Sequence, residues 1–495
     1  MDTNFALTVF NIMAQLFVWL VGVVIIGIAV VYVVDRVQTK HAVRRNYPVI
    51  GHLRYWFEHL GEFFRQYFFA MDREEMPFNR AERTWVYRAA KNEDSTLAFG
   101  SSRDLRPVGS ILFVNCPYPT LEIDAEDTSS VVLGPYCDIP YETDSVFHIS
   151  GMSFGAISKP AVQALSRGAK KAGVWMNTGE GGLSPWHLEG GADLVYQIGT
   201  AKYGVRDEAG ALCDERLQAM AAHEQVRMFE IKLSQGAKPG KGGILPAEKV
   251  TDEIARIRSI EAGKPSISPN RHPEINTAEE LLDMIERVRA VTGKPTGFKA
   301  VIGSYGWLDE LCEAIHSRGI ESAPDFIAID SADGGTGAAP ASLMDYMGLP
   351  LKESLPLVVD ILIKHSLRDR IKVIASGKLV NPAQVAWAMC IGADFAVSAR
   401  GFMFSLGCIQ ALQCNKNTCP TGVATHNAAL QRGLVVTDKA ERVYQYAKNM
   451  RKEVGILAHS CGVPEPRRLQ RFHCRIVQAN GLSVPLDELY PSASV

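Results

Sequence analysis

Short apolar segments alternate with helix-like stretches after about residue 130, and this pattern restricts the possible folds more than any other feature. Such alternation is typical of a parallel sheet with crossover helices. Eight segments qualify as strands: Val146–Ile149, Val174–Asn177, Leu194–Ile198, Met228–Leu233, Gly297–Val301, Phe326–Asp330, Lys372–Ala375 and Phe395–Ser398. Eight strands suit a closed (β/α)8 TIM barrel, although an open doubly wound sheet shows the same alternation.

One helix start can be predicted in detail. Ser158 is a suitable N-cap, Pro160 suits the first turn, and Gly173 ends the pattern. The apolar positions between them indicate one buried face: Ala161, Val162, Leu165 and Ala169.

Glycine-rich or polar loops follow six of the eight predicted strands. They are Gly151–Gly155, Thr178–Gly182, Ser234–Gly243, Asp333–Gly337, Ser376–Gly377 and Ala399–Gly401. A barrel builds its active site from the loops at this end of its strands. Glycine lets backbone N–H groups approach a phosphate or a planar ring closely. Turn formation alone would explain one glycine run, but six on one rim indicate a binding site.

Two parts of this rim have a predicted role in binding a ligand. The loops after the seventh and eighth strands usually bind phosphate, which here singles out Ser376, Gly377, Arg400 and Gly401. Lys299 lies inside the fifth strand, which is otherwise uncharged. A lysine projecting into the barrel mouth would favour electron density on a reduced ring. The alternative is a strand-end lysine that reaches solvent.

Cysteines are too few for a disulfide framework, with ten in 495 residues, and a net charge of −2 offers no basic surface for nucleic acid. Seven are scattered and fit small buried hydrophobic residues: Cys116, Cys137, Cys213, Cys312, Cys390, Cys461 and Cys474. The other three, Cys408, Cys414 and Cys419, lie within twelve residues and precede Pro420. Their close spacing suggests a shared ligand.

Three interpretations of this cysteine cluster compete. Zinc normally takes four ligands with shorter cysteine spacings, and His426 would have to be the fourth. Chance proximity is the second. The third is an iron–sulfur cluster, since cysteine thiolates hold such clusters and a flanking proline is familiar in ferredoxin-like runs. Three cysteines suggest a cluster with three protein-bound irons, placed next to the barrel mouth.

The amino-terminal segment predicts a membrane anchor. No charged residue occurs in positions 3–34, and the 19 residues of Leu16–Val34 would span roughly 29 Å as a helix, close to the bilayer's hydrocarbon thickness. A cleaved secretory signal is the rival, but it would begin with basic residues and have a shorter apolar region. Here the start carries Asp2, and the basic residues follow at Arg36, Lys40, Arg44 and Arg45, which predicts a single-pass protein with a cytoplasmic body.

An aromatic stretch follows this segment. Tyr55–Phe69 combines eight aromatic residues with charged ones in an amphipathic helical pattern. Such a helix either packs on the body of the protein or lies on the membrane surface. The sequence favours neither.

With these motifs in hand, the chain resembles the FMN-binding synthase domain of glutamate synthases, of the large-subunit type, in a membrane-anchored stand-alone form. The resemblance covers about residues 100–460. Five motifs in preserved order carry it: His148–Ser158, Asn177–Gly182, Glu230–Gly240, Asp333–Ala338 and Cys408–Thr425.

The resemblance implies a TIM barrel that binds FMN and a 3Fe–4S cluster on Cys408, Cys414 and Cys419. It implies an oxidoreductase acting on CH–NH2 groups, which uses reduced FMN to convert 2-oxoglutarate and ammonia to L-glutamate. Lys299 and Glu180 would be catalytic, and Glu180, Lys238 and Lys241 would bind substrate. The implied FMN contacts are Met152, Ser153, Asn177, Gln235, Lys299, Gly334, Gly335, Thr336, Ser376, Gly377, Arg400 and Gly401.

The expected domain organisation is an anchor at 1–35, a membrane-proximal helical or irregular segment at 36–130, the FMN barrel at 131–405, and the iron–sulfur segment with a helical extension at 406–495. No glutaminase domain and no dinucleotide-binding G-x-G-x-x-G pattern are recognised. We therefore expect electrons from a partner such as ferredoxin or a reductase subunit, and ammonia that is free or supplied by a separate glutaminase.

Other activities remain open at this point. Relatives of the domain make N-methylglutamate from methylamine and glutamate, which is a transferase reaction. An FMN oxidase of 2-hydroxy acids is disfavoured because such barrels need a histidine base near the seventh strand, and Lys372–Leu379 has none. A non-catalytic anchor or assembly factor would have no need for Lys299, Glu180 and the three cysteines together.

Overall fold

The computed structural model describes residues 3–491 and divides the chain into two compact units, Met1–Ala81 and Glu82–Val495. The first unit contains α1 (Thr3–Val37), α2 (Ala42–Asn46), α3 (Gly51–Phe64) and a π-helical turn η1 (Arg65–Phe69). The second unit begins within α4 (Arg80–Ala90) and therefore includes the later part of the predicted segment 36–130. The other predicted domain boundaries stay predictions.

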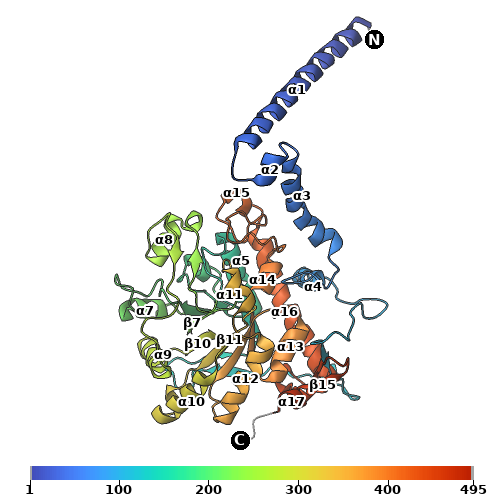
Figure 1. Cartoon of the computed structure of the whole chain (residues 1–495). Helices are drawn as coiled ribbons and strands as arrows, with labels where there is room; N and C mark the ends of the chain where they lie inside the picture. The colour runs from blue at the N-terminus through green and yellow to red at the C-terminus, as the bar shows by residue number, and fades with distance from the viewer. Residues whose placement is uncertain (1–2, 492–495) are drawn as a thin grey trace. The chain divides into compact units, whose positions relative to one another are not determined.

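The long apolar helix expected at the amino terminus is present. Figure 1 shows α1 as one continuous helix, and Leu7–Val37 is long and apolar enough to cross a membrane, with a mean hydropathy of 2.9 in its most apolar part. A signal sequence meets the same criteria of length and composition. The apolar helix is confirmed, and its role as a membrane anchor stays a prediction.

The second unit is built on a closed barrel of eight parallel strands. All eight strands lie at the segments predicted from the sequence: β4 (Phe147–Ile149), β5 (Met176–Asn177), β6 (Leu194–Ile198), β7 (Val226–Lys232), β10 (Thr296–Val301), β11 (Phe326–Asp330), β12 (Lys372–Ser376) and β13 (Phe395–Ser398). Because β13 pairs with β4 and β7 pairs with β10, the sheet closes on itself. The TIM barrel is confirmed, and the open sheet is excluded.

Helices connect the strands in chain order. They are α5 (Lys159–Ala172), α6 (Pro185–Leu188), α7 (Asp214–Ala221), α8 (Asp252–Arg258), α9 (Ala278–Thr292), α10 (Gly306–Arg318), α11 (Ala341–Tyr346), α12 (Leu351–Lys364), α13 (Pro382–Ile391) and α14 (Arg400–Ser405). After α15 (Ala428–Gln431), the long helix α16 (Val436–Ser460) packs on both α5 and α13 (Figure 1). It thereby fills the place of the barrel's eighth helix. The segment between α14 and α16, which carries the cysteine cluster, consequently takes the position of the last strand-to-helix loop.

Smaller elements complete the second unit. A three-stranded sheet joins β1 (Ile111–Phe113), β14 (Cys474–Val477) and β15 (Ser483–Pro485), and α17 (Leu486–Leu489) follows. Two antiparallel pairs consist of β2 (Val131–Leu133) with β3 (Tyr141–Thr143) and β8 (Ile244–Leu245) with β9 (Ser266–Ile267). The 3-10 turns are η2 (Glu122–Asp124), η3 (Ala247–Lys249), η4 (Ile320–Ser322), η5 (Pro466–Arg468) and η6 (Arg471–His473).

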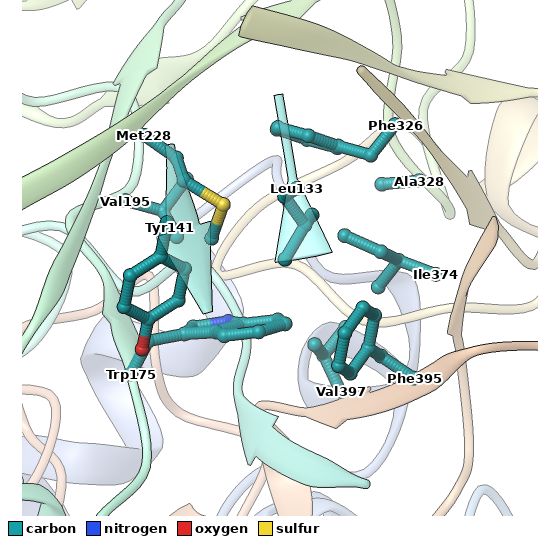
Figure 2. Close-up of a cluster of buried hydrophobic side chains, with 10 residues drawn as sticks. All are labelled: Leu133, Tyr141, Trp175, Val195, Met228, Phe326, Ala328, Ile374, Phe395 and Val397. Atoms are coloured by element: carbon teal, nitrogen blue, oxygen red, sulfur yellow. The ribbon is translucent and has the colours of Figure 1, made fainter. Parts of the chain in front are cut away.

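An apolar layer fills the barrel near the amino ends of its strands. The barrel contributes Trp175, Val195, Met228, Phe326, Ala328, Ile374, Phe395 and Val397, all buried. Leu133 and Tyr141, from the β2–β3 pair, belong to the same cluster, and Figure 2 shows Leu133 in the midst of the barrel side chains. This packing makes the lower barrel a solid core. The polar side chains of the barrel interior, such as Lys299 and Asp330, therefore lie beyond this layer, toward the carboxyl ends of the strands.

The predicted helix start at Ser158 is confirmed and supports a stability prediction. The Ser158 side chain accepts a hydrogen bond from the backbone N–H of Ala161, and Gly173 ends α5 in the left-handed conformation. We expect Ser158→Ala to lower the free energy of unfolding by about 1 kcal/mol, because an N–H of the first turn loses its partner. Thermal denaturation checks this. The control is Ser317→Ala, an exposed serine near the end of α10, which should leave the midpoint unchanged.

Candidate active site

A lysine on the fifth barrel strand lies among acidic side chains at the barrel mouth. Lys299 of β10 is in register with Lys232 of β7, and its Nζ lies 3.3 Å from Oδ2 of Asp330 in β11. Lys299 and Asp330 are both buried. Burial opposes the lysine's charge, but the carboxylates of Asp330 and Glu230 outweigh it and raise the pKa of Lys299. Lys299 is thus a protonated interior group, and the solvent-exposed alternative is excluded.

Asp330 connects the loops around this lysine. Its carboxylate accepts hydrogen bonds from the Gly236 backbone N–H at 2.8 Å and from the Ser376 hydroxyl at 2.7 Å. A side chain at position 236 would meet the Ser331 carbonyl oxygen at 2.2 Å, so only glycine permits this approach. Asp330 therefore joins the loop after β7 and the end of β12 to Lys299 of β10.

Glu230 is a buried acid that sequence reasoning did not assign to the site. Its Oε1 accepts hydrogen bonds from Asn177 Nδ2 at 2.9 Å and from Gln197 Nε2 at 2.6 Å. The signal was available, because Glu230 and Lys232 alternate along an otherwise mostly apolar strand and so point to the same face. The barrel interior thus carries a polar layer above its apolar core.

A second cluster of charged side chains surrounds Glu180 in the loop after β5. Glu180 lies 2.9 Å from Lys232 Nζ, which also donates to the side chain of Gln235. Burial opposes ionisation of Glu180, but Lys232 and Lys238 outweigh it and lower its pKa. Lys238 is 3% exposed, and burial together with the charge of Lys232 lowers its pKa to about 8. The structure therefore brings Glu180, Gln235 and Lys238 together, and it adds Lys232.

Arg258, the last residue of α8, is a further cation that the sequence did not reveal. Its side chain is buried, and it donates to the Phe154 carbonyl oxygen at 3.3 Å. Its Nε has no hydrogen-bond partner among the residues of the described structure. A side chain on Gly181, next to Glu180, would lie 2.9 Å from the guanidinium. An anionic group entering here would find donors in place.

The loops after β4 and β5 interlock at one side of the mouth. The Gly179 N–H donates to Asn177 Oδ1 at 2.9 Å, and Met152 N–H donates to the Asn177 carbonyl oxygen at 3.3 Å. A side chain on Gly179 would meet the Ser153 backbone nitrogen at 2.6 Å. Met152, Ser153 and Asn177, three predicted FMN contacts, therefore lie together.

The predicted phosphate-binding loops converge after β11, β12 and β13, the last of which is the neighbour of β4 in the barrel. A side chain on Gly335 would lie 2.7 Å from Arg400 Nε, and one on Gly377, whose φ is 127°, would meet Ser331 Cβ at 2.2 Å. Burial lowers the pKa of Arg400 to about 10, against the opposing effect of Asp333, so the guanidinium remains charged near neutrality. These close approaches form a cradle after the last three barrel strands.

The other predicted contact residues in these loops lie in different surroundings. Gly334 lies close to Gly236, since a side chain on Gly334 would lie 3.2 Å from the Gly236 Cα, and Thr336 is half-buried. Gly401 packs against the hydroxyl of Tyr446 in α16. This contact requires glycine at position 401 whether or not a ligand binds there. The Lys241 side chain is exposed, unlike that of Lys238. Roles for Gly401 in FMN binding and Lys241 in substrate binding stay predictions.

The three clustered cysteines occupy the loop between α14 and α15. Burial raises the pKa of Cys408 to about 12, with further contributions from nearby Cys414 and Cys419. Within residues 3–491, no three His, Cys, Asp or Glu side chains are grouped so that they would hold a single metal ion. The imidazole Nε2 of His426 is 2.8 Å from the Gly155 carbonyl oxygen. The described residues therefore offer no zinc site.

Two features nevertheless prepare this loop for an anionic thiolate near the barrel mouth. Burial opposes ionisation of Cys419, but hydrogen bonds from the Thr421 hydroxyl and from backbone N–H groups of the following residues outweigh it and lower its pKa. The buried Lys249 Nζ donates to the carbonyl oxygens of Ala156, at 2.7 Å, and Cys414, at 3.1 Å. Lys249 thus joins the cysteine loop to the loop after β4.

Known proteins are similar to this chain in sequence. The family described as "Conserved region in glutamate synthase" matches residues 112–464. A glutamate synthase large subunit-like protein of Bacillus subtilis is 38% identical, with 97% of this chain and 98% of that protein covered. The flavin-binding domain of baker's yeast flavocytochrome b2 is 14% identical over 84% of each chain, with a TM-score of 0.45.

Two further relatives are longer than the region that they share with this chain. The archaeal-type glutamate synthase [NADPH] of Thermotoga maritima is 32% identical, and the match covers 63% of this chain and 59% of that protein. The archaeal glutamate synthase [NADPH] of Methanocaldococcus jannaschii is 32% identical over 69% of this chain and 64% of its own length. Since the matched region spans more than half of the chain and the Bacillus relative matches almost throughout, this protein belongs to the glutamate synthase family.

Proposed function

We propose that this protein is a glutamate synthase-like oxidoreductase that reductively aminates 2-oxoglutarate to L-glutamate with FMN and a 3Fe–4S cluster. One observation carries the proposal: the buried cations Lys232, Lys238 and Arg258 surround Glu180 on the same rim as the Lys299–Asp330 ion pair. A dicarboxylate needs such cations, and an amination needs a carboxylate that moves protons. Family membership supports the same reaction.

The barrel mouth fits FMN. The cradle formed by Gly335, Ser376, Gly377 and Arg400 has the close backbone approach and the cation that a phosphate requires. The interlocked loops with Met152, Ser153 and Asn177 follow the adjoining strands β4 and β5, and a ring system held there would share the barrel mouth with Lys299. When bound and reduced, FMN would supply the hydride for the reaction.

The cysteine loop fits an iron–sulfur cluster better than a single metal ion. A cluster carries its own sulfides and holds its thiolates further apart than one ion does. Cys408, Cys414 and Cys419 provide the thiolates, and the donors around Cys419 favour the ionised form. The cluster would supply single electrons beside the flavin loop, to which Lys249 joins the cysteine loop.

Side chains of this protein then have separate roles at the substrate. Lys238 and Arg258 bind the carboxylates of 2-oxoglutarate, and their burial strengthens each contact by excluding water. Ionised Glu180 accepts a hydrogen bond from ammonia and directs its lone pair at the keto carbon, and the keto oxygen leaves as water when the imine forms. Lys232 holds the Glu180 carboxylate in place. Lys299 maintains a fixed positive charge where electron density accumulates.

Partners and location complete the proposal. Electrons would come from ferredoxin or a reductase subunit, and ammonia from solution or from a separate glutaminase. Helix α1 would anchor the protein by a single span, with the basic residues after Val34 and the catalytic body on the cytoplasmic side. Resistance of the full chain to extraction from membranes by alkaline carbonate tests the anchor independently of activity.

Anaerobic assays of the full chain with reduced flavin test the reaction. We expect 2-oxoglutarate plus ammonium to reoxidise the flavin and yield one L-glutamate per flavin. The transferase alternative predicts instead that methylamine plus glutamate yields N-methylglutamate without net flavin oxidation. A flavin that stays reduced in the presence of 2-oxoglutarate and ammonium would falsify the proposed function.

The low pKa of Lys238 makes substrate binding sensitive to pH. Lys238 is charged below about pH 8 and neutral above it, so its attraction for a carboxylate is lost as the pH rises. We expect the KM for 2-oxoglutarate to rise about tenfold per pH unit above pH 8. Lys238→Arg keeps its charge in this range and should abolish the rise. A wild-type KM that is flat from pH 7 to about 9.5 contradicts the role of Lys238.

A further inference from the structure

The first unit presents an exposed aromatic helix face after α1. Apolar side chains recur at three- and four-residue spacing along α3 and η1 and fall on one side: Leu53, Trp56, Phe57, Leu60, Phe63, Phe64, Tyr67 and Phe68. The other side bears Arg54, Glu58, Glu62 and Arg65. Except for Leu60, the apolar side chains are 41–75% exposed. We call this apolar side the α3 face. So many adjoining aromatic groups in water are unfavourable and mark an interaction surface.

The start of α3 is held at the end of α1 by a buried carboxylate. Asp35, near the end of α1, is 2% exposed. Its Oδ1 lies 2.9 Å from His52 Nε2, and its Oδ2 accepts from the Val49 N–H at 2.9 Å. The Gln38 side chain also donates to the His41 carbonyl oxygen at 2.8 Å. These bonds define the connection, so α3 starts where the apolar stretch of α1 stops.

Basic side chains lie along this connection. They are Arg36, Lys40, Arg44 and Arg45, with Arg54 on the first turns of α3. Arg44 lies over the ring of Tyr55, at 4.7 Å from its centroid. Cations beside an aromatic helix at the end of a membrane span match the phosphates of anionic lipids.

We propose that the α3 face lies in the interfacial layer of the bilayer that α1 spans, with the neighbouring basic residues on anionic phospholipid headgroups. The inference rests on the proposed anchoring by α1. Tryptophan and tyrosine rings prefer the headgroup level, and a helix with one aromatic and one charged side lies flat there. Because only residues 38–50 separate α1 from α3, a membrane spanned by α1 is within reach of α3. The protein would thus contact its membrane through a second element beside the anchor.

Quenching by brominated lipids tests this in the full chain. The protein is reconstituted into vesicles of phosphatidylcholine and phosphatidylglycerol whose acyl chains are brominated near the headgroup. Trp19 lies in α1 and Trp56 in the α3 face. We expect Trp56→Phe to remove about half of the lipid-quenched emission, because Trp19 supplies the rest. Trp19→Phe reports the anchor separately.

The outcomes distinguish this inference from the proposed anchoring and function. Loss of quenching in Trp19→Phe but not in Trp56→Phe means that α1 spans while α3 lies elsewhere, on the barrel unit or in water, which overturns the inference alone. Absence of quenching in the wild-type chain overturns the anchor as well. Neither result bears on glutamate formation, which is assayed without vesicles.

A matched pair of variants tests the face itself. Phe57→Asp places a charge within the α3 face, whereas His59→Asp places the same charge outside the face, at its edge beside Phe63. We expect Phe57→Asp to abolish the Trp56 quenching and His59→Asp to preserve it, because only the first buries a carboxylate in the acyl boundary. Equal quenching in both variants contradicts an oriented helix.

Discussion

Replacing Lys299 by Met should reduce turnover by about 10²–10³-fold, equivalent to about 3–4 kcal/mol of transition-state stabilisation. Lys299 is the buried cation between Asp330 and Glu230, and its raised pKa keeps it charged. Methionine fills similar space but leaves both carboxylates without that charge. We therefore also expect weaker FMN retention and a stability loss of about 3–5 kcal/mol, typical of breaking a buried ion pair. Anaerobic turnover, the FMN content of the purified protein and its thermal midpoint measure the three effects.

Two comparison variants separate charge from folding. Lys299→Arg retains the cation and should recover FMN binding more fully than turnover, because the guanidinium has a different shape. Lys372→Met removes a lysine at the amino end of β12, whose Nζ donates to the Asp369 carbonyl oxygen, and should leave FMN binding and turnover unchanged. Unchanged FMN content and turnover in Lys299→Met would remove this lysine from the mechanism.

Replacing Cys419 by Ser should empty the cysteine loop of iron. Cys419 is the thiol with a lowered pKa, surrounded by donors that favour its thiolate. We expect the iron content of anaerobically purified protein to fall from about three per chain to less than one, with loss of the cluster's EPR signal. FMN should stay bound, because its predicted contacts lie on other loops. Glutamate formation should persist when the flavin is reduced chemically and stop when a protein donor supplies the electrons.

A scattered thiol supplies the control for this prediction. Cys312 is buried in α10, outside the cysteine loop, so it is not a predicted ligand of the cluster. Cys312→Ser should keep its iron, its EPR signal and its dependence on the protein donor. Wild-type protein with full flavin absorbance but no iron after anaerobic purification would contradict the cluster, while leaving the flavin site intact.

Much of the fold could be predicted because it depends on local patterns. Every barrel strand was found from a short apolar run, and α5 was found from its cap, proline and terminal glycine. The closing of the barrel was not decided by such patterns. It depends on pairing between β13 and β4, whose residues are far apart in the chain. The place of the eighth helix likewise depends on α16, which follows the cysteine loop in the chain and packs on α5 and α13.

The candidate site was predicted in part for the same reason. Lys299 and Glu180 stood out because a charge in an apolar strand, or between glycines, is visible in the sequence. Arg258 did not, because an arginine in a charged helix usually faces solvent and only the burial of α8's last residue shows otherwise. Lys241 fitted the same motif as Lys238, but its side chain is exposed whereas that of Lys238 is buried.

By itself, the sequence determined the eight strands, the glycine-rich rim, the apolar amino-terminal helix and the clustered cysteines, since each is set by residue types close together in the chain. Only the tertiary structure decided that Glu230, Lys232 and Arg258 join Lys238 and Lys299, and that Lys249 joins the cysteine loop to the loop after β4. The physical reason is that strand alternation tells which face a side chain occupies, whereas its partners are chosen by the closing of the barrel and the packing of loops distant in sequence.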